Sequence, residues 1–514
     1  MTADANIRQV VDRPVVETGY GPLRGIDDGR VKTWKGIRYA AAPVGELRWR
    51  APVAPEPWTE IVDATAFGSV SPQPRSPIPM GLGTRADEDC LFLNVWAPSA
   101  AEPDARKPVM VWVHGGAYIF GSGSQPLYDG SVLAADSDVV VVTINYRLGA
   151  LGFVDFSAAG FDSNIALRDV LAALRWVRDN IAGFGGDPDR VTLFGESAGA
   201  GVVTTLLAVP AAAGLFSRAI AQSSPATSVY DSSRAATVTG LILDRLGMTA
   251  QQAHRAPVQA LVDASAYVFD HVPTATPGRL AFAPTVDGDL VPDYPVSVAR
   301  AGKTHPVPLL IGTNKDEAAL FRFMRSPLMP IAPKAIRTMF EEIADDQPGL
   351  ELPSEEQIGS AYPARWARTR SLGVASDVGF RMPTVWFAEG HSAVAPVFLY
   401  RFDWATPVFK LIRLGAAHAT ELIYVWGNLV SGSRDVTFKL GGLKTGEALS
   451  QRMRTRWTNF AATAEPAGPA GEPNWQPYRT DGRATLVIDR QDELVDDLDR
   501  QVRLAWGDQV LSFR

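Results

Sequence analysis

The sequence predicts an α/β fold in which a large, mostly parallel sheet is flanked by helices. Short, continuous Val-rich runs at 109–113 and 138–145 are typical of strands covered on both faces. The segment 164–181 repeats apolar residues at three- and four-residue steps, which indicates an amphipathic helix between strands. A short strand at 191–194 runs through a GxSxG turn into a small-residue helix at 197–210. This alternation of strand and helix favours one α/β sheet.

The N-terminal region is predicted to begin with a loose leader, residues 1–12. Short runs that alternate or stay apolar between Gly-containing turns then indicate an antiparallel hairpin region, at 15–19, 22–25 and 31–39. The Pro-containing stretches 43–49 and 52–79 are expected to form a long irregular surface segment. A strand is expected to follow at 89–96.

The rest of the chain adds further strands and two long insertions. Strands are predicted at 219–222, 308–311, 396–402 and 484–488, and a helix at 452–463. Residues 226–304 and 325–390 are expected to form cap or substrate-pocket insertions over the site. No internal repeat or linker is visible, so a single domain over residues 1–514 is the simplest interpretation.

Composition narrows the class of protein. The chain has 514 residues, 46% of them hydrophobic, and a net charge of -7 with Lys and Arg scattered among acids. This distribution offers no basic face to nucleic acid or to an anionic membrane. Residues 1–17 lack the apolar core of a signal peptide, and no long apolar run follows. Cys90 is the single cysteine, which excludes an intrachain disulfide and fits a reducing compartment. We therefore expect a cytoplasmic protein without metal or cofactor, either a monomer or a homodimer.

Ser197, at the centre of the GxSxG turn, is the candidate nucleophile. A strand that turns this tightly into a helix forces the serine into a strained conformation, which is tolerable when Gly195 and Gly199 carry no side chains. The strain pushes the hydroxyl toward a substrate. The helix N-terminus adds free N–H groups and a partial positive charge where an oxyanion would form.

A serine hydroxyl needs a base and an orienting acid, which follow such a serine in the order acid and then histidine. His418 lies in the small-residue loop 415–421 and is the preferred base, with His391 as the alternative. Four histidines are disfavoured by position or surroundings, namely His114, His254, His271 and His305. Glu317 follows directly on the 308–311 strand, where open α/β sheets gather functional side chains, and Asp316 is its rival.

The stretch 114–117, His-Gly-Gly-Ala, is the candidate oxyanion hole. It follows the strand 109–113, and its glycines let the backbone approach a substrate closely. Gly115 is expected to support the loop, and Gly116 and Ala117 are assigned as N–H donors, with the N–H of Ala198 as the third. Each such donor contributes about 3 kcal/mol to transition-state stabilisation in comparable enzymes.

With these residues in hand, the chain resembles the type B carboxylesterases, the α/β-hydrolase family that includes bacterial para-nitrobenzyl esterases, animal carboxylesterases and cholinesterases. The motifs that carry the resemblance, in chain order, are GIRYA at 36–40, PVGELR at 43–48, EDCLFLN at 88–94, NYRLG at 145–149, FGGDP at 184–188, GESAG at 195–199 and NKDE at 314–317. The resemblance covers most of the chain. It implies an α/β-hydrolase fold with a triad of Ser197, Glu317 and His418.

The resemblance also implies roles for residues outside the triad. Ser223 and Glu421 are expected to support the histidine, and Glu196 marks the GESAG variety of the serine turn. Arg48 and Glu88 are expected to form a structural ion pair.

The chain departs in several positions from the secreted members of the family that it resembles. Those relatives pair the cysteine of the EDCLFLN motif with an earlier one, where this chain has Ser71. The loop 77–87 has no tryptophan, so the aromatic platform for a choline cation is absent from it. The expected substrate-pocket residues are Tyr118, Gly278, Leu280 and Phe321. Gly278 and Leu280 stand where cholinesterases are bulkier, which predicts a roomier acyl site.

These observations favour a serine hydrolase that cleaves small aryl or alkyl carboxylic esters through an acyl-enzyme. The same residues could serve a lactone, carbamate or polyester substrate. A second alternative is a non-catalytic binding protein on the same fold.

Overall fold

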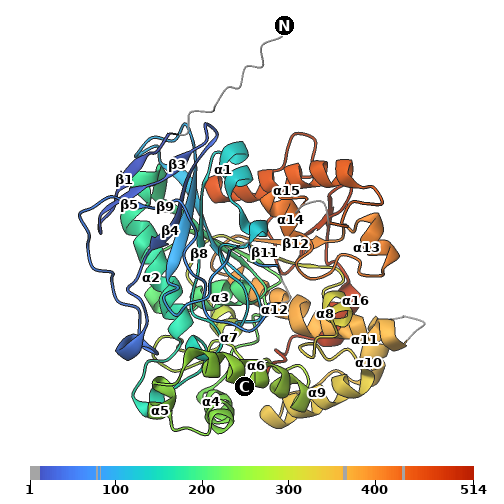
Figure 1. The fold of residues 1–514 in the computed structure, drawn as a ribbon. Helices are drawn as coiled ribbons and strands as arrows, with labels where there is room; N and C mark the ends of the chain where they lie inside the picture. The colour runs from blue at the N-terminus through green and yellow to red at the C-terminus, as the bar shows by residue number, and fades with distance from the viewer. Residues whose placement is uncertain (1–11, 77–78, 82, 363–366, 431–434, 514) are drawn as a thin grey trace.

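The computed structural model describes the chain apart from residues 1–11, 77–78, 82, 363–366, 431–434 and 514, which are grey in Figure 1. The expected loose leader therefore lies outside the described residues, apart from Asp12. Among the described helices, none is long and apolar enough to cross a bilayer.

An 11-stranded sheet forms the centre of the molecule, in the order β14-β13-β12-β11-β10-β9-β7-β8-β6-β4-β3 (Figure 1). Its strands are β3 Ile26–Asp27, β4 Val31–Arg38, β6 Phe92–Pro98, β7 Lys107–Val113, β8 Val140–Ile144, β9 Gly186–Glu196, β10 Arg218–Gln222, β11 Leu309–Asn314, β12 Val397–Phe402, β13 Thr485–Ile488 and β14 Glu493–Val495. The seven strands from β8 to β13 in this order pair in parallel, and the outer pairs are antiparallel. The prediction of a large, mostly parallel sheet is confirmed.

A small second sheet lies at the N-terminal side. It contains β1 Val15–Glu17, β2 Pro22–Arg24 and β5 Val62–Asp63. Strands β1 and β2 form the expected antiparallel hairpin. The expectation of a surface segment at 52–79 was wrong in part, because this segment supplies β5 and buries Ala64, Val70 and Ser71 almost completely.

Helices cover both faces of the main sheet. They are α1 Ser131–Ser137, α2 Ile165–Asn180, α3 Ala198–Leu206, α4 Ser232–Leu246, α5 Ala250–His254, α6 Val258–Ala275, α7 Pro295–Arg300, α8 Ala318–Met324, α9 Pro333–Asp346, α10 Glu355–Ala361, α11 Ala367–Ser376, α12 Met382–His391, α13 Pro407–Leu411, α14 Leu422–Trp426, α15 Leu443–Thr463 and α16 Arg500–Trp506. A π-helical turn, Asp377–Arg381, joins α11 to α12. Helix α12 lies within the expected insertion 325–390 except for its last residue, and it packs against α7 and β11.

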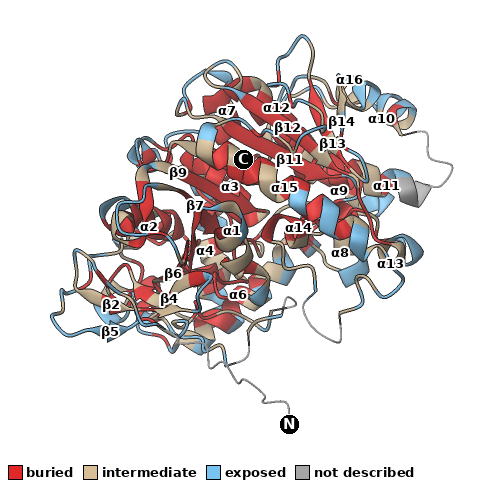
Figure 2. Cartoon of the chain, turned by 90° about the horizontal axis from the view of Figure 1, so that it is seen from above, coloured by how far each residue is buried: buried red, intermediate tan, exposed pale blue. Residues whose placement is uncertain are grey.

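The strand side chains divide between two hydrophobic cores. Along β7, Val109, Val111 and Val113 belong to one core, whereas Met110 and Trp112 belong to the other. All five are fully buried, as expected for a strand whose alternate side chains point to opposite faces. Figure 2 shows the same burial in red along β7, β9, β11 and β12 and in α3. The sheet is therefore a rigid frame that fixes the ends of its strands.

A buried ion pair ties the loop after β8 to helix α2. Arg147 donates to both oxygens of Asp169, through Nε at 2.8 Å and Nη2 at 2.6 Å, and the side chains are 3% and 0% exposed. Asp169 also accepts the backbone N–H of Arg147. Removal of one partner would leave the other charge buried and unpaired.

We therefore expect Asp169→Asn to lower the free energy of unfolding by about 3–5 kcal/mol, because the Arg147 guanidinium loses its counter-charge inside the protein. Urea unfolding followed by fluorescence measures the change. The matched control is Asp179→Asn, which breaks the exposed pair with Arg178 and is expected to cost less than about 1 kcal/mol. Equal effects of the two substitutions would contradict this role of the buried pair.

Candidate active site

Ser197 lies between the end of β9 and the start of α3. Its backbone has φ 55° and ψ -125°, a region that L-residues rarely adopt. The N–H of Ser197 donates to the carbonyl of Gln222 in β10, and its own carbonyl accepts from Gly201 in α3. These two hydrogen bonds fix the turn to β10 and to α3. The strained backbone of Ser197 is the conformation that the sequence predicted.

The flanking glycines are required by close backbone contacts. A Cβ on Gly199 would lie 2.0 Å from the carbonyl oxygen of Val113, and one on Gly195 would lie 2.7 Å from the carbonyl carbon of Gly199. A Cβ on Gly115 would meet Glu196 at 2.8 Å and the Cβ of Ser197 at 3.1 Å. Helix α3, the end of β7 and the loop after it therefore pack with no side chain between them.

The structure brings Ser197, His418 and Glu317 into one hydrogen-bonded chain. The distance from Ser197 Oγ to His418 Nε2 is 2.8 Å, and the distance from His418 Nδ1 to Glu317 Oε2 is 2.6 Å. Glu317 follows β11 and is fully buried, whereas His418 lies between β12 and α14 and is 6% exposed. This is the arrangement that nucleophile, base and orienting acid require.

The two alternatives occupy other positions. His391 lies in α12, where its ring bonds with Thr304 Oγ1 at 2.8 Å and with the carbonyl of Val307 at 2.9 Å. Asp316 accepts the backbone N–H of Ala416, so it holds the loop that carries His418 without bonding to the ring.

A second layer of hydrogen bonds fixes the carboxylate of Glu317. Its Oε1 accepts from Ser223 Oγ at 2.5 Å and from the N–H of Asn314 at 2.7 Å. Ser223 follows β10 directly and has a left-handed backbone, φ 51°. The remaining oxygen, Oε2, is left for His418.

Glu421 lies behind this layer and is also fully buried. Its Oε1 accepts from Gln222 Nε2 at 3.0 Å and its Oε2 from Asn314 Nδ2 at 2.5 Å. Asn314 Nδ2 also donates to the carbonyl of Ala417, next to His418. Sequence reasoning missed Gln222 and Asn314, although both end a parallel strand at the edge where functional side chains gather.

Glu196 is a second carboxyl group beside the histidine ring. Its Oε1 lies 3.1 Å from His418 Nε2 and has no other hydrogen-bond partner among the described residues. Burial raises the pKa of Glu196 to about 8, against the attraction of His418. Burial alone would lower the pKa of His418, but the nearby charges of Glu196 and Glu317 outweigh it and raise that pKa to about 9.

The loop after β7 contains the residues that the sequence assigned to an oxyanion hole. Gly116, Ala117 and Tyr118 have positive φ angles of 121°, 51° and 64°, and the carbonyl of Gly116 accepts from Ile119 and Phe120. Among the described residues, the backbone N–H groups of Gly116, Ala117 and Ala198 have no hydrogen-bond acceptor. These donors remain available to a developing negative charge.

Two phenylalanines form an apolar wall at the histidine. The ring centroids of Phe321 and Phe380 lie 5.2 Å and 4.6 Å from that of His418. Phe321, in α8, was an expected pocket residue. Phe380, in the π-helical turn, was missed because its segment shows no clear periodicity.

The other expected pocket residues are Tyr118, Gly278 and Leu280. Tyr118 is 1% exposed and packs on Phe153 and on α3, where a Cβ on Gly201 would lie 2.2 Å from its hydroxyl. Gly278 lines a small cavity with Met339, and Leu280 donates its N–H to Tyr230. The assignment of all three to the substrate pocket stays a prediction.

Other details concern metals and the cysteine motif. No group of three or more His, Cys, Asp or Glu side chains in the described ranges is arranged to hold a metal ion.

Arg48 and Glu88 form the ion pair that the resemblance implies, at 2.6 Å. Cys90 is buried and free, and burial raises the pKa of its thiol.

Comparisons with known proteins agree with this geometry. The model of the carboxylesterase family matches residues 12–506. The chain is 38% identical to para-nitrobenzyl esterase of Bacillus subtilis (strain 168) over 95% of its length and 97% of that protein. It is 33% identical to acylcarnitine hydrolase of Mus musculus, over 90% and 85%. A solved PNB esterase structure, 36% identical, covers 96% of this chain and 100% of its own with a TM-score of 0.83.

The two carboxyl groups around His418 lead to a pH prediction. As the candidate base, His418 must be neutral to accept a proton, so we expect activity above its pKa and a loss of activity below it. Glu196→Gln removes a negative charge that raises this pKa, so the acid limb of the kcat/KM profile should move to lower pH, by about 1 to 3 units.

The profile is measured with p-nitrophenyl acetate, corrected for spontaneous hydrolysis. Glu447→Gln, an exposed substitution on α15, is the matched control and should leave the limb in place. An acid limb of Glu196→Gln at the wild-type pH, or above it, would contradict the electrostatic role of Glu196.

Proposed function

The chain belongs to the carboxylesterase family and hydrolyses carboxylic esters with a serine nucleophile, and we propose that Ser197 is that serine. His418 acts as its base and Glu317 as the orienting acid. The observation that carries this proposal is the continuous chain of short contacts, 2.8 Å from Ser197 Oγ to His418 Nε2 and 2.6 Å from His418 Nδ1 to Glu317 Oε2.

In the first half of the reaction, His418 Nε2 takes the hydroxyl proton as Ser197 Oγ attacks the ester carbonyl carbon. The carbonyl oxygen becomes negative and accepts hydrogen bonds from the N–H groups of Gly116, Ala117 and Ala198. His418 then gives its proton to the leaving alkoxide, so the alcohol departs and the acyl group stays on Ser197.

In the second half, His418 takes a proton from water, which attacks the acyl carbon. Collapse of the second tetrahedral intermediate returns a proton to Ser197 Oγ and releases the carboxylic acid. Glu317 stabilises the imidazolium at both stages and fixes the tautomer with hydrogen on Nδ1. Its own orientation depends on Ser223 and Asn314.

We propose small aryl or alkyl esters as the substrates. The apolar rings of Phe321 and Phe380 beside His418 support this choice, since flat or short apolar groups pack well on aromatic faces. The name of the para-nitrobenzyl esterase relative points to the same class of substrate.

The setting of the enzyme is also part of the proposal. We propose one α/β-hydrolase domain over residues 1–514, with 226–304 and 325–390 contributing to the cap or the substrate pocket. The free, buried Cys90 supports a cytoplasmic location. For the oligomeric state, we propose a monomer or a homodimer.

Ser197→Ala is expected to lower kcat with p-nitrophenyl acetate or butyrate by at least about 10⁴-fold, because the proposed nucleophile that forms the acyl-enzyme is removed. A fluorophosphonate probe should label the wild-type protein and leave Ser197→Ala unlabelled. Ser157→Ala, at an exposed position, is the matched control and should behave as wild type.

Two results would overturn the assignment. Near-normal turnover by Ser197→Ala would place the nucleophile elsewhere. A wild-type protein that neither turns over these esters nor takes up the probe would favour a non-catalytic binding protein on this fold.

A further inference from the structure

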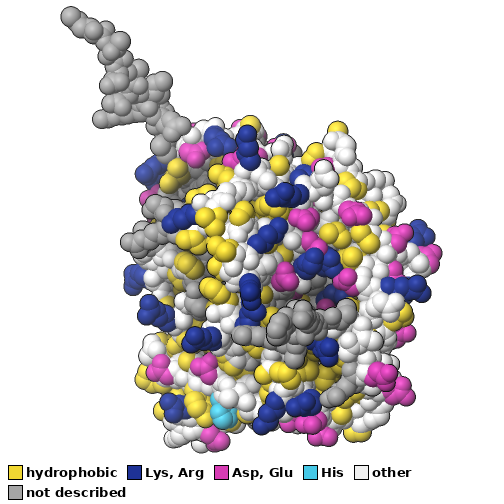
Figure 3. Space-filling view, turned by 90° about the vertical axis from the view of Figure 1, so that its right-hand side faces the viewer, with side chains coloured by type: hydrophobic (Ala, Val, Ile, Leu, Met, Phe, Trp, Pro, Cys, Tyr) yellow, Lys and Arg dark blue, Asp and Glu magenta, His cyan; other side chains and the backbone are white. Residues whose placement is uncertain are grey.

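A large cavity lies on the other side of the segments that surround His418. Its volume is about 1170 Å³, which is enough for a nucleotide-sized molecule. Its lining comes from the ends of β11 and β12, from α8, α10, α11, α13 and α16, from the π-helical turn, and from the loop before His418. Figure 3 shows this side of the molecule, on which Lys and Arg side chains are interspersed with Asp and Glu side chains.

The cavity is basic although the chain as a whole is acidic. Seven basic side chains line it, Lys315, Arg322, Arg370, Arg381, Arg401, Lys410 and Arg413, against three acidic ones, Asp316, Asp377 and Asp499. The net charge of the whole chain is -7. The lining therefore has an excess of positive charge, opposite in sign to the net charge of the chain.

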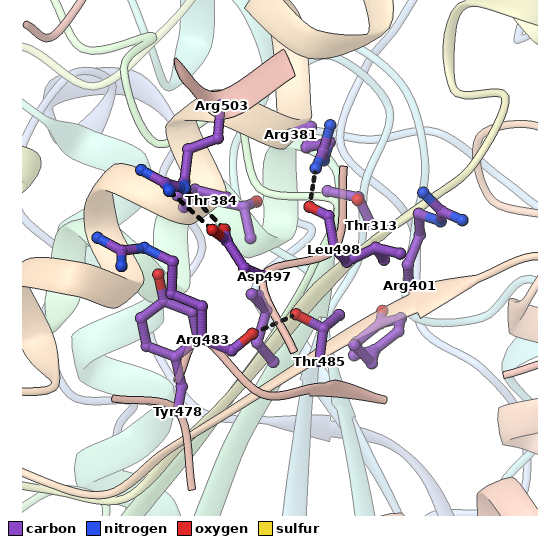
Figure 4. Close-up of a pocket in the computed structure, with 13 residues that line it drawn as sticks. Thr313, Arg381, Thr384, Arg401, Tyr478, Arg483, Thr485, Asp497, Leu498 and Arg503 are labelled. Atoms are coloured by element: carbon purple, nitrogen blue, oxygen red, sulfur yellow. Dashed lines mark hydrogen bonds and ion pairs between the residues drawn. The ribbon is translucent and has the colours of Figure 1, made fainter. Parts of the chain in front are cut away.

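Three of the seven cations are already neutralised. Lys315 pairs with Asp403 at 3.0 Å, Arg401 with Asp403 at 2.7 Å, and Arg381 with Asp499 at 3.3 Å. Figure 4 shows Arg381 donating to the carbonyl of Leu498 in a smaller neighbouring cavity. These side chains therefore hold the wall together.

The other four cations have no carboxylate within 4 Å among the described residues. They are Arg322, Arg370, Lys410 and Arg413. Arg322 donates to the carbonyl of Arg413, and Lys410 lies over the ring of Trp404 at 5.4 Å. Like charges gathered around one hollow repel each other, and a bound anion relieves that repulsion.

The type of cation and the rest of the lining indicate the ligand. Three of the four are Arg, whose planar fork binds phosphate and carboxylate oxygens in pairs. Apolar side chains of Leu372, Leu414 and Val502 and the ring of Tyr362 also line the cavity. The cationic side chains can therefore bind the anionic groups of a small organic molecule, and the apolar side chains can contact its carbon skeleton.

We propose that this cavity is a binding site for a small organic molecule that carries two or more phosphate or carboxylate groups. The site is separate from the ester-binding site and does not take part in the acyl-transfer steps.

The two sites share three wall segments. Helix α8 places Phe321 at His418 and Arg322 in the cavity. The π-helical turn does the same with Phe380 and Arg381, and the loop 413–418 runs from Arg413 in the cavity to His418 itself. A ligand that fixes these segments also changes how easily the apolar wall and the imidazole move, so ester turnover responds to its occupancy.

Direct binding tests the site on the full-length protein, without any ester. Calorimetric titrations with pyrophosphate and with citrate are run at constant ionic strength, with sodium chloride as the monovalent reference. We expect saturable binding of at least one polyanion at one site per chain. Pyrophosphate alone would identify a phosphate ligand, and citrate alone a carboxylate ligand.

The double variant Arg370→Gln with Arg413→Gln removes two exposed, unpaired cations, so folding should be unaffected. We expect its dissociation constant to rise by at least about tenfold, since charge-assisted hydrogen bonds are lost. Arg175→Gln, an exposed position on α2, is the matched control and should bind as wild type. No saturable binding to the wild type, or equal binding to the double variant, would overturn the proposal.

The link to turnover is measured separately with p-nitrophenyl acetate. Saturating polyanion should change kcat or KM of the wild type by about twofold or more and leave the double variant unchanged. Binding with no effect on either constant would remove the link while leaving the site in place. Because the titrations use no ester, failure of the proposed esterase mechanism and failure of this site give different results.

Discussion

The close packing of α3 against the end of β7 is the contact on which the site depends. The carbonyl of Val113 lies where a side chain on Gly199 would begin, so the backbone of the helix rests directly on the backbone of the strand. This contact places Ser197 at the start of a helix and beside the loop 114–117 at the same time. The nucleophile and the candidate oxyanion donors are therefore positioned by a single steric condition. A methyl group there would push them apart.

The site also depends on hydrogen-bond donors for its buried carboxyl groups, and the ends of the parallel strands supply them. Three buried carboxyl groups, Glu196, Glu317 and Glu421, lie close together, and the first two contact the imidazole of His418. Such a concentration of acids is costly in a low-dielectric interior unless each has donors or a shared proton. The ends of β10 and β11 supply the donors, with Gln222 and Asn314 as the main ones. Adjacent strand ends thus hold the acids around His418, and the rigid sheet fixes their spacing.

The parts that the sequence predicted correctly are those encoded in short, local patterns. The Val-rich strands, helix α2 and the serine turn each carry their own periodicity or glycine spacing. The assignment of His418 and Glu317 rests on chain order and strand ends and stays a prediction; the two side chains lie within hydrogen-bond distance of each other. What escaped prediction depends on packing between distant segments. Phe380 reaches the histidine through a π-helical turn with no periodic signal, and Val70 and Ser71 are buried in a Pro-rich stretch that resembles a surface loop. Gln222 and Asn314 become partners of Glu421 only after the strands align.

The edges of the main sheet have a consequence for the behaviour of the protein in concentrated solution. Strand β3 at one edge has two residues and β14 at the other has three, and both are antiparallel to their neighbours. An open edge is a template for pairing with the sheet of another molecule, and a short one offers too few free N–H and C=O groups to start a ladder. The short edge strands therefore protect this 11-stranded sheet against edge-to-edge aggregation.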